Sequence, residues 1–205
     1  MKAKHIALLL IPINIILFYF VYNSVNDYMD FEASAKIRIS ENIQKLKDLR
    51  QVQIGHKKAK GYYARDFNSL IRFLESGQIP TIKAIGEIPD EMTEEEALKL
   101  GLISRDTIYV NAKDHIFDEV YLRSRNKSFR LEIEKLHQIP QSEIEYNINA
   151  GTIEKGKVLV QVFEISATYE NILKGLNAKN KNYDLNSLLK VGSMYEASLN
   201  GNWGE

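Results

Sequence analysis

A long apolar run near the N-terminus is the feature that most restricts how this chain folds. Residues 6–22 read IALLLIPINIILFYFVY and contain no Asp, Glu, Lys, Arg or His. At a rise of 1.5 Å per residue, a helix of this length is about 26 Å long, which is close to the thickness of the hydrocarbon core of a bilayer. The sequence therefore predicts a transmembrane anchor to which the rest of the chain is attached.

Two other interpretations fit this run less well. A cleaved signal peptide ends in a small-x-small site, whereas this run ends in Phe20-Val21-Tyr22-Asn23 without such a pair. A buried core helix rarely lacks a polar face over so many residues. Pro12 lies near the start of the span, where a kink costs little, and Asn14 is either tolerated in lipid or bonded to a neighbouring helix. We therefore predict an uncleaved signal anchor.

The charges beside the run predict its orientation. Lys2 and Lys4 precede it, and the first charges after it are Asp27 and Asp30. Because basic flanks stay in the cytoplasm, we expect a single-pass protein of the inner (cytoplasmic) membrane with its N-terminus inside. The C-terminal domain is then periplasmic or otherwise extracytoplasmic, and inner-membrane lipid is the first expected partner.

The stretch that follows the run favours one long helix. Between Pro12 and Gly55 there is neither Pro nor Gly, so a helix over residues 13–54 is uninterrupted by either residue. Because residues 23–30 contain Asn, Ser and Asp, which prefer helix caps, a break there is the alternative. Apart from Glu32, the members of one stripe at spacings of three and four are apolar: Val21, Val25, Tyr28, Ala35, Ile39, Ile43, Leu46 and Leu49.

The remaining sequence predicts short helices and then strands. Asp66 is a suitable N-cap for a helix that ends at Gly77, and Thr93 with Glu96 forms the capping-box pair of a helix over 94–100. Residues 78–90 are expected to be extended and rich in turns. We expect a short helix at 168–176, a polar tail at 177–205, and strands at 107–111, 129–134, 144–149 and 158–165, the last two forming an antiparallel pair with a long loop.

These patterns predict an α+β fold in which an N-terminal transmembrane helix continues into a long amphipathic helix packed on a small antiparallel sheet head. We expect three parts: residues 1–24 as the cytoplasmic start and anchor, residues 25–60 as a helical stalk, and residues 61–205 as the exported head with its tail. The chain has no cysteine, so its own core must stabilise the head without disulfides.

The composition and motifs point away from several functions. The 27 basic and 27 acidic residues balance, which argues against nucleic acid as a partner. None of the four histidines pairs with another at metal-ligand spacing, and no phosphate-binding or nucleophile motif occurs. The run Glu94–Glu96 is explained by the favourable field at the start of a helix. We therefore predict no catalytic residue, no metal and no cofactor.

One charge asymmetry leaves two interpretations open. Residues 36–65 contain nine bases and two acids, whereas residues 87–96 contain six acids and no base. The two segments either attract each other within one head, or they form a docking surface for copies of the chain or for other envelope proteins. For the docking hypothesis the predicted partner-binding residues are Lys57, Lys58, Lys60, Tyr62 and Tyr63.

Three blocks of the sequence resemble an uncharacterised family of single-pass bacterial envelope proteins. They are 46–77 (LKDLRQVQIGHKKAKGYYARDFNSLIRFLESG), 96–110 (EALKLGLISRDTIYV) and 191–203 (VGSMYEASLNGNW). More distantly, a membrane helix that continues into an amphipathic helix, a Gly-Tyr-Tyr turn and a sheet resembles type IV pilins and pseudopilins. The chain lacks their Gly-Phe leader site and the glutamate five residues beyond it. The resemblance therefore implies an assembly or scaffold component instead of a processed filament subunit.

Three classes of function remain after these arguments. We predict an envelope structural or assembly protein that acts through protein–protein contacts, of the kind found in pili or secretion apparatus. The alternative is a periplasmic binding module for an envelope ligand such as peptidoglycan or lipid. An enzyme is the third class, and no motif in the sequence supports it.

Overall fold

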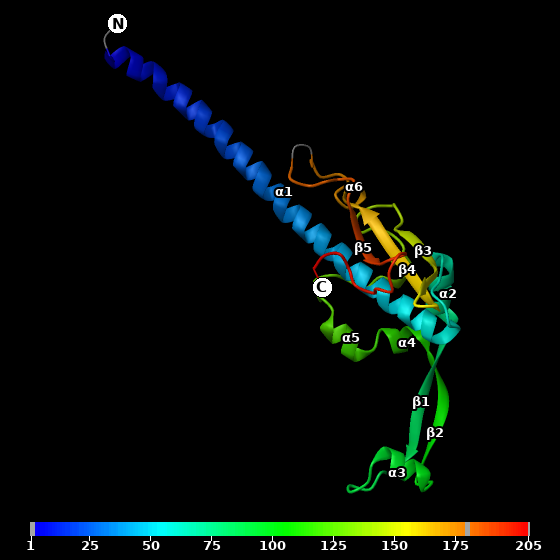
Figure 1. Cartoon of the computed structure of the whole chain (residues 1–205). Helices are drawn as coiled ribbons and strands as arrows, with labels where there is room; N and C mark the ends of the chain where they lie inside the picture. The colour runs from blue at the N-terminus through cyan, green and yellow to red at the C-terminus, as the bar shows by residue number, and fades with distance from the viewer. Residues whose placement is uncertain (1–2, 179–180, 205) are drawn as a thin grey trace.

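One helix organises the whole molecule. The computed structural model describes residues 3–178 and 181–204, with the side chains of residues 3–9 and of Ala84 left out of the description. Helix α1 (Ala3–Lys60) is 58 residues long, and the other elements lie along its C-terminal half or beyond its C-terminal end (Figure 1). The predicted continuity of this helix through residues 23–30 is confirmed, and Pro12 lies inside the helix without ending it.

The first half of α1 stands free of the body. Every residue from 10 to 30 is exposed, and the first buried residues of α1 are Phe31 and Ala35. The lower part of the predicted stripe is therefore confirmed as core at Leu46 and Leu49. The members of the stripe nearest the apolar run, Val21, Val25 and Tyr28, are exposed.

The predicted membrane span lies in this free half. Across the residues that the structure describes, no helix combines the length and the apolar character needed to cross a membrane. The start of the predicted span, residues 6–9, belongs to the part whose side chains are outside the description.

The body contains a three-stranded antiparallel sheet in the order β3-β4-β5. Strand β3 (Asn147–Lys155) pairs with β4 (Val158–Thr168) as predicted, although a two-residue turn replaces the long loop that was expected. Gly156 and Lys157 both have positive φ, which suits a tight hairpin turn. Strand β5 (Leu188–Gly192) lies in the predicted polar tail and was not expected, and its Leu189 and Val191 are buried.

The core lies between this sheet and α1. Phe163 and Ile165 of β4 are fully buried, and helix α6 (Tyr169–Ile172) follows that strand. Helix α2 (Phe67–Ser76) packs beside α1 and contributes Leu70 and Leu74 to the same core. As predicted, it begins at the N-cap Asp66, whose side chain accepts a hydrogen bond from Ser69 N at 2.8 Å, and it ends before Gly77.

A two-stranded arm extends from the body beyond the C-terminal end of α1 (Figure 1). Strands β1 (Gln78–Gly86) and β2 (Ile103–Asn111) pair antiparallel along their full length, and helix α3 (Glu94–Lys99) lies at the tip. The predicted capping box of α3 is confirmed. At the base of the arm, Ile79 is fully buried beside Gly55 of α1. We call residues 78–111 the arm.

The segment between the arm and the sheet is mostly irregular. It contains the short helices α4 (Ala112–Ile116), α5 (Glu119–Ser124) and η1 (Ile133–Lys135). The predicted strand at 129–134 is wrong, because this backbone bonds locally: Phe129 O accepts from Arg125, and Ile133 O accepts from Leu136 N. Apolar and polar residues alternate in this sequence because Leu131 and Ile133 pack against the core from one side of an irregular chain.

The arm also separates the two charged segments. The acidic residues 87–96 lie at its tip, at a distance from α1, on which most of the basic segment 36–65 is placed (Figure 1). The two segments therefore do not face each other within one molecule, and mutual attraction does not explain their charges.

Candidate functional site

The C-terminal half of α1 buries five polar side chains in the body, and they contact several different parts of the fold. Asn42 accepts a hydrogen bond from the hydroxyl of Tyr146. The Gln53 amide bonds both backbone groups of Ala64 at 2.9 Å. These residues were not predicted, because a polar residue on a helix reads as solvent-facing in a sequence. The full set is Asn42, Gln44, Asp48, Gln53 and His56.

Asp48 is the centre of the densest polar cluster. Its side chain is 1% exposed, and it accepts two hydrogen bonds from the Arg125 guanidinium, each 2.8 Å long. The Tyr121 hydroxyl and the Gln44 amide also donate to it, at 2.7 and 3.1 Å. Burial and then the nearby Asp48 raise the pKa of Tyr121, and the hydrogen bonds to Asp48 raise the pKa of Arg125. The cluster thereby fixes the irregular segment on α1.

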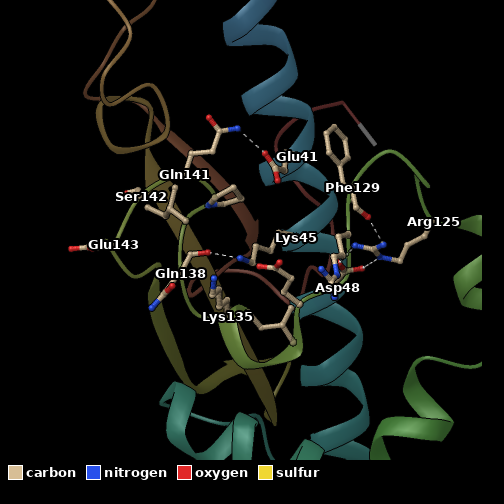
Figure 2. A pocket seen from close by; sticks show the side chains of 15 residues that line it. Glu41, Lys45, Asp48, Arg125, Phe129, Lys135, Gln138, Gln141, Ser142 and Glu143 are labelled. Carbon is tan, nitrogen blue, oxygen red and sulfur yellow. Dashed lines mark hydrogen bonds and ion pairs between the residues drawn. The ribbon is translucent and has the colours of Figure 1, made fainter.

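A groove of about 920 Å³ opens beside this cluster (Figure 2). One side is formed by α1 with Glu41, Lys45 and Asp48, and Gln141 donates a hydrogen bond to Glu41 at 3.3 Å across it. The other walls come from residues 125–143, which carry charges of both signs: Arg125, Arg130, Glu132, Lys135 and Glu143.

Lys45 is the cation at the middle of the groove (Figure 2). Its Nζ donates to the backbone oxygen of Gln138 at 2.7 Å. An ammonium has three N–H donors, so this bond leaves capacity for a ligand. Burial lowers the pKa of Lys45 to about 8, although Glu132 and Glu41 oppose that shift. The group is therefore mainly charged at neutral pH and becomes neutral just above it.

The chemistry of this groove suits a small zwitterionic ligand. Lys45 is placed to bind a carboxylate, and the acidic residues Glu41, Glu132 and Glu143 of the lining can accept from an amine. Within the part of the chain that the structure describes, no group of three or more Asp, Glu or His side chains is arranged to hold a metal ion.

The five predicted partner-binding residues are divided between surface and core. Tyr63 is buried, packs on Phe163 with ring centroids 4.7 Å apart, and lies under the Lys57 ammonium at 4.7 Å. Lys58 Nζ is 3.2 Å from His115 Nε2 but stays exposed. Of the predicted set, Lys58, Lys60 and Tyr62 therefore share the surface at the end of α1, whereas Tyr63 is a core residue covered by Lys57.

The turn that carries these residues is fixed from α1. His56 is buried, and its Nδ1 lies 2.9 Å from the Tyr62 carbonyl oxygen, to which it donates. The bonds between Gln53 and Ala64 hold the next residues. The end of α1 is therefore a rigid surface, which is what a contact site requires.

Comparison with protein-family models, curated proteins and solved structures finds no match to this chain. The resemblance to single-pass envelope proteins and, more distantly, to pilins stays a prediction from the residues quoted above.

The first prediction concerns the Asp48 cluster. Arg125→Met should lower the free energy of unfolding by about 3–5 kcal/mol, because it leaves a buried carboxylate without its cation. The matched control is Arg123→Met: Arg123 pairs with Glu119 one turn away but is 78% exposed, so a change within about 0.5 kcal/mol is expected. Urea unfolding of the full-length chain in detergent, followed by tryptophan fluorescence, measures both. Equal losses in the two variants would contradict the central role of the cluster.

The second prediction concerns the pH dependence that Lys45 confers. Its pKa is about 8 in the folded chain and 10.5 for a free lysine, so between these values the unfolded chain binds more protons. The stability of the wild type should therefore rise relative to Lys45→Met as the pH increases from about 8 to 10.5, and should not change relative to it below pH 7. Lys60→Met, at an exposed position, is the control. A constant difference over the whole range would show that Lys45 is not desolvated.

Proposed function

We propose that this chain is a membrane-anchored structural or assembly protein of the bacterial envelope that acts through protein–protein contacts. The observation that carries the proposal is the continuity of α1, which joins the apolar run 6–22 to the body without a hinge. A single rigid helix fixes the distance of the body from the apolar run and the orientation of the body's contact surfaces.

The exposed half of α1 supports lipid as the material around it. Large apolar side chains point to all sides of the helix between residues 10 and 22, and none of them is buried in the described structure. Leaving such a surface in water is unfavourable by about 25 cal/mol per Å². The charges beside the run, Lys2 and Lys4 before it and Asp27 and Asp30 after it, favour a cytoplasmic N-terminus and a periplasmic C-terminal domain.

The spacing along α1 places the body outside the bilayer. Phe31, the first of the described side chains of α1 to be buried, lies nine positions after Tyr22 at the end of the run, which corresponds to about 13 Å of helix. The end of α1, where Lys58, Lys60 and Tyr62 share the surface, is then about 55 Å from the end of the span. At that distance these residues suit contacts with other envelope proteins or with copies of the chain, in the manner of pilus or secretion components.

The third prediction tests the anchor. Leu17→Arg places a charge in the middle of the run and should cost about 3 kcal/mol of insertion free energy, so that alkaline carbonate extracts much of this variant from membranes. Ile37→Arg changes an equally exposed apolar residue of α1 beyond the span and should leave the chain in the membrane fraction.

An alkaline phosphatase fusion at Gly55 should be active, because that enzyme folds only in an oxidising exterior. Activity only from a cytoplasmic reporter at the same position would reverse the orientation. Complete extraction of the wild type by carbonate would refute the anchor, and a mature chain that begins near residue 24 would show a cleaved signal peptide.

A second candidate function rests on the groove. Its exposed charges and the donor capacity of Lys45 favour a binding module for a peptide-bearing envelope ligand such as peptidoglycan. The fourth prediction is that a zwitterionic peptidoglycan stem peptide binds the full-length chain and raises the pKa of Lys45 above about 8, since a bound carboxylate stabilises the ammonium. Calorimetry should show binding weakened about tenfold or more in Lys45→Met, as expected for a charge-assisted hydrogen bond. Lys60→Met is the control, and equal affinities in both variants would exclude the groove.

A further inference from the structure

We propose that the arm is a self-association surface, in which strand β2 of one copy pairs antiparallel with β2 of a second copy. The inference rests on the proposed function in that it names one partner for its protein–protein contacts. It does not depend on the membrane anchor, so the two can be tested separately.

The arm presents an unpartnered sheet. Strands β1 and β2 pair only with each other in the described structure, so the outer edge of each carries backbone N–H and C=O groups without a neighbouring strand. Both faces are largely exposed, and Ile82 and Tyr109 are 70% and 66% exposed. An isolated two-stranded hairpin is only marginally stable in water. A further strand on this arm would therefore supply both hydrogen bonds and apolar cover.

The two edges of the arm are not equivalent. Strand β1 contains Pro80, which has no N–H to donate, and it ends at Gly86. Strand β2 reads ISRDTIYVN, without Pro or Gly, and is rich in β-branched residues. The edge of β2 can therefore accept a strand along its whole length, and β1 cannot.

The sequence of β2 also selects a register. A twofold antiparallel pair places one residue opposite its own copy, and a centre at Arg105 or Asp106 would oppose like charges. Thr107 is the middle residue of β2, so a centre there pairs the entire strand. That register sets Thr107 beside Thr107 of the second copy and places Arg105 opposite Tyr109, where a guanidinium can lie on the aromatic ring.

The charges along the arm make a second copy the fitting partner. Antiparallel arms place the tip of one beside the base of the other. The tip carries the six acids of residues 87–96, of which Glu94 is already paired with Arg105 of β2 at 2.9 Å. The base lies against α1 at Gly55, within two turns of the lysines that end the helix: Lys57, Lys58 and Lys60. The tip of the arm and the end of α1 therefore carry opposite charges, as a twofold interface between two copies requires.

The fifth prediction uses the absence of cysteine from the chain, which makes single-cysteine variants unambiguous. Thr107→Cys in the full-length chain in detergent should form a disulfide-linked dimer on mild oxidation, because the two sulfurs are directly opposed. The control is Ile82→Cys: Ile82 lies opposite Thr107 within the hairpin but on the β1 edge, so that variant should form no disulfide-linked dimer.

Charge reversal gives an independent test without cysteine. Lys58→Glu with Lys60→Glu should lower the dimer fraction at least tenfold by light scattering, because the acidic tip then faces a base that carries two new carboxylates. Glu91→Lys with Glu95→Lys changes the net charge of residues 87–96 from −6 to −2 and should lower the dimer fraction less. Raised salt should weaken the wild-type dimer.

Several outcomes would overturn the proposal. A monomeric wild type with no crosslink at Thr107, or a crosslink at Ile82 alone, refutes pairing through β2. A monomer whose arm binds a different envelope protein refutes the second copy as the partner. If the wild type stays in the membrane fraction after carbonate extraction while these tests fail, only the arm pairing is wrong. If the chain dimerises but carbonate extracts it from membranes, only the anchor is refuted.

Discussion

The ion pair between Asp48 and Arg125 is the interaction on which the rest of the body depends. Both side chains are almost completely buried, so each charge is tolerated only because the other is held in bidentate contact. The pair joins the middle of α1 to a segment that has little regular structure of its own. Apolar contacts alone would let such a segment slide along a smooth helix, whereas a buried polar contact at one height selects one position. Asn42 and Gln53, on either side of Asp48 along α1, fix the positions of Tyr146 and Ala64 by hydrogen bonds in the same way.

The groove is a consequence of that arrangement. Since Arg125 is fixed on α1, the chain from 125 to 143 must return to the sheet beside the helix, and its irregular backbone leaves a hollow one turn along, at Lys45. The Gln138 carbonyl that bonds Lys45 is free to do so because it belongs to no strand or helix. The same irregular path that replaces the predicted strand at 129–134 thus places Lys45 where burial lowers its pKa.

The sequence predicted what local signals encode. The continuity of α1, the caps at Asp66 and Thr93, and the hairpin of β3 and β4 all follow from contacts between near neighbours in the chain. Strand β5 was missed because its partner is distant in sequence and its surroundings are rich in Asn and Gly. The candidate site was missed for another reason. A buried polar residue on a helix does not change the spacing of apolar residues in the sequence, so that spacing cannot reveal it. The one available signal was the presence of Asp48 among nine bases.

The arm shows how the rigid helix shapes the proposed function. Because α1 has no hinge between the apolar run and Gly55, the base of the arm lies about 50 Å from the end of the span. If the apolar run is the proposed anchor, a contact made by the arm is made far from the bilayer, and the exposed half of α1 stays available to lipid. The groove and the arm strands have no residue in common, so ligand and partner would not compete for the same residues. Strand pairing at the arm would then join anchored copies while leaving each groove open.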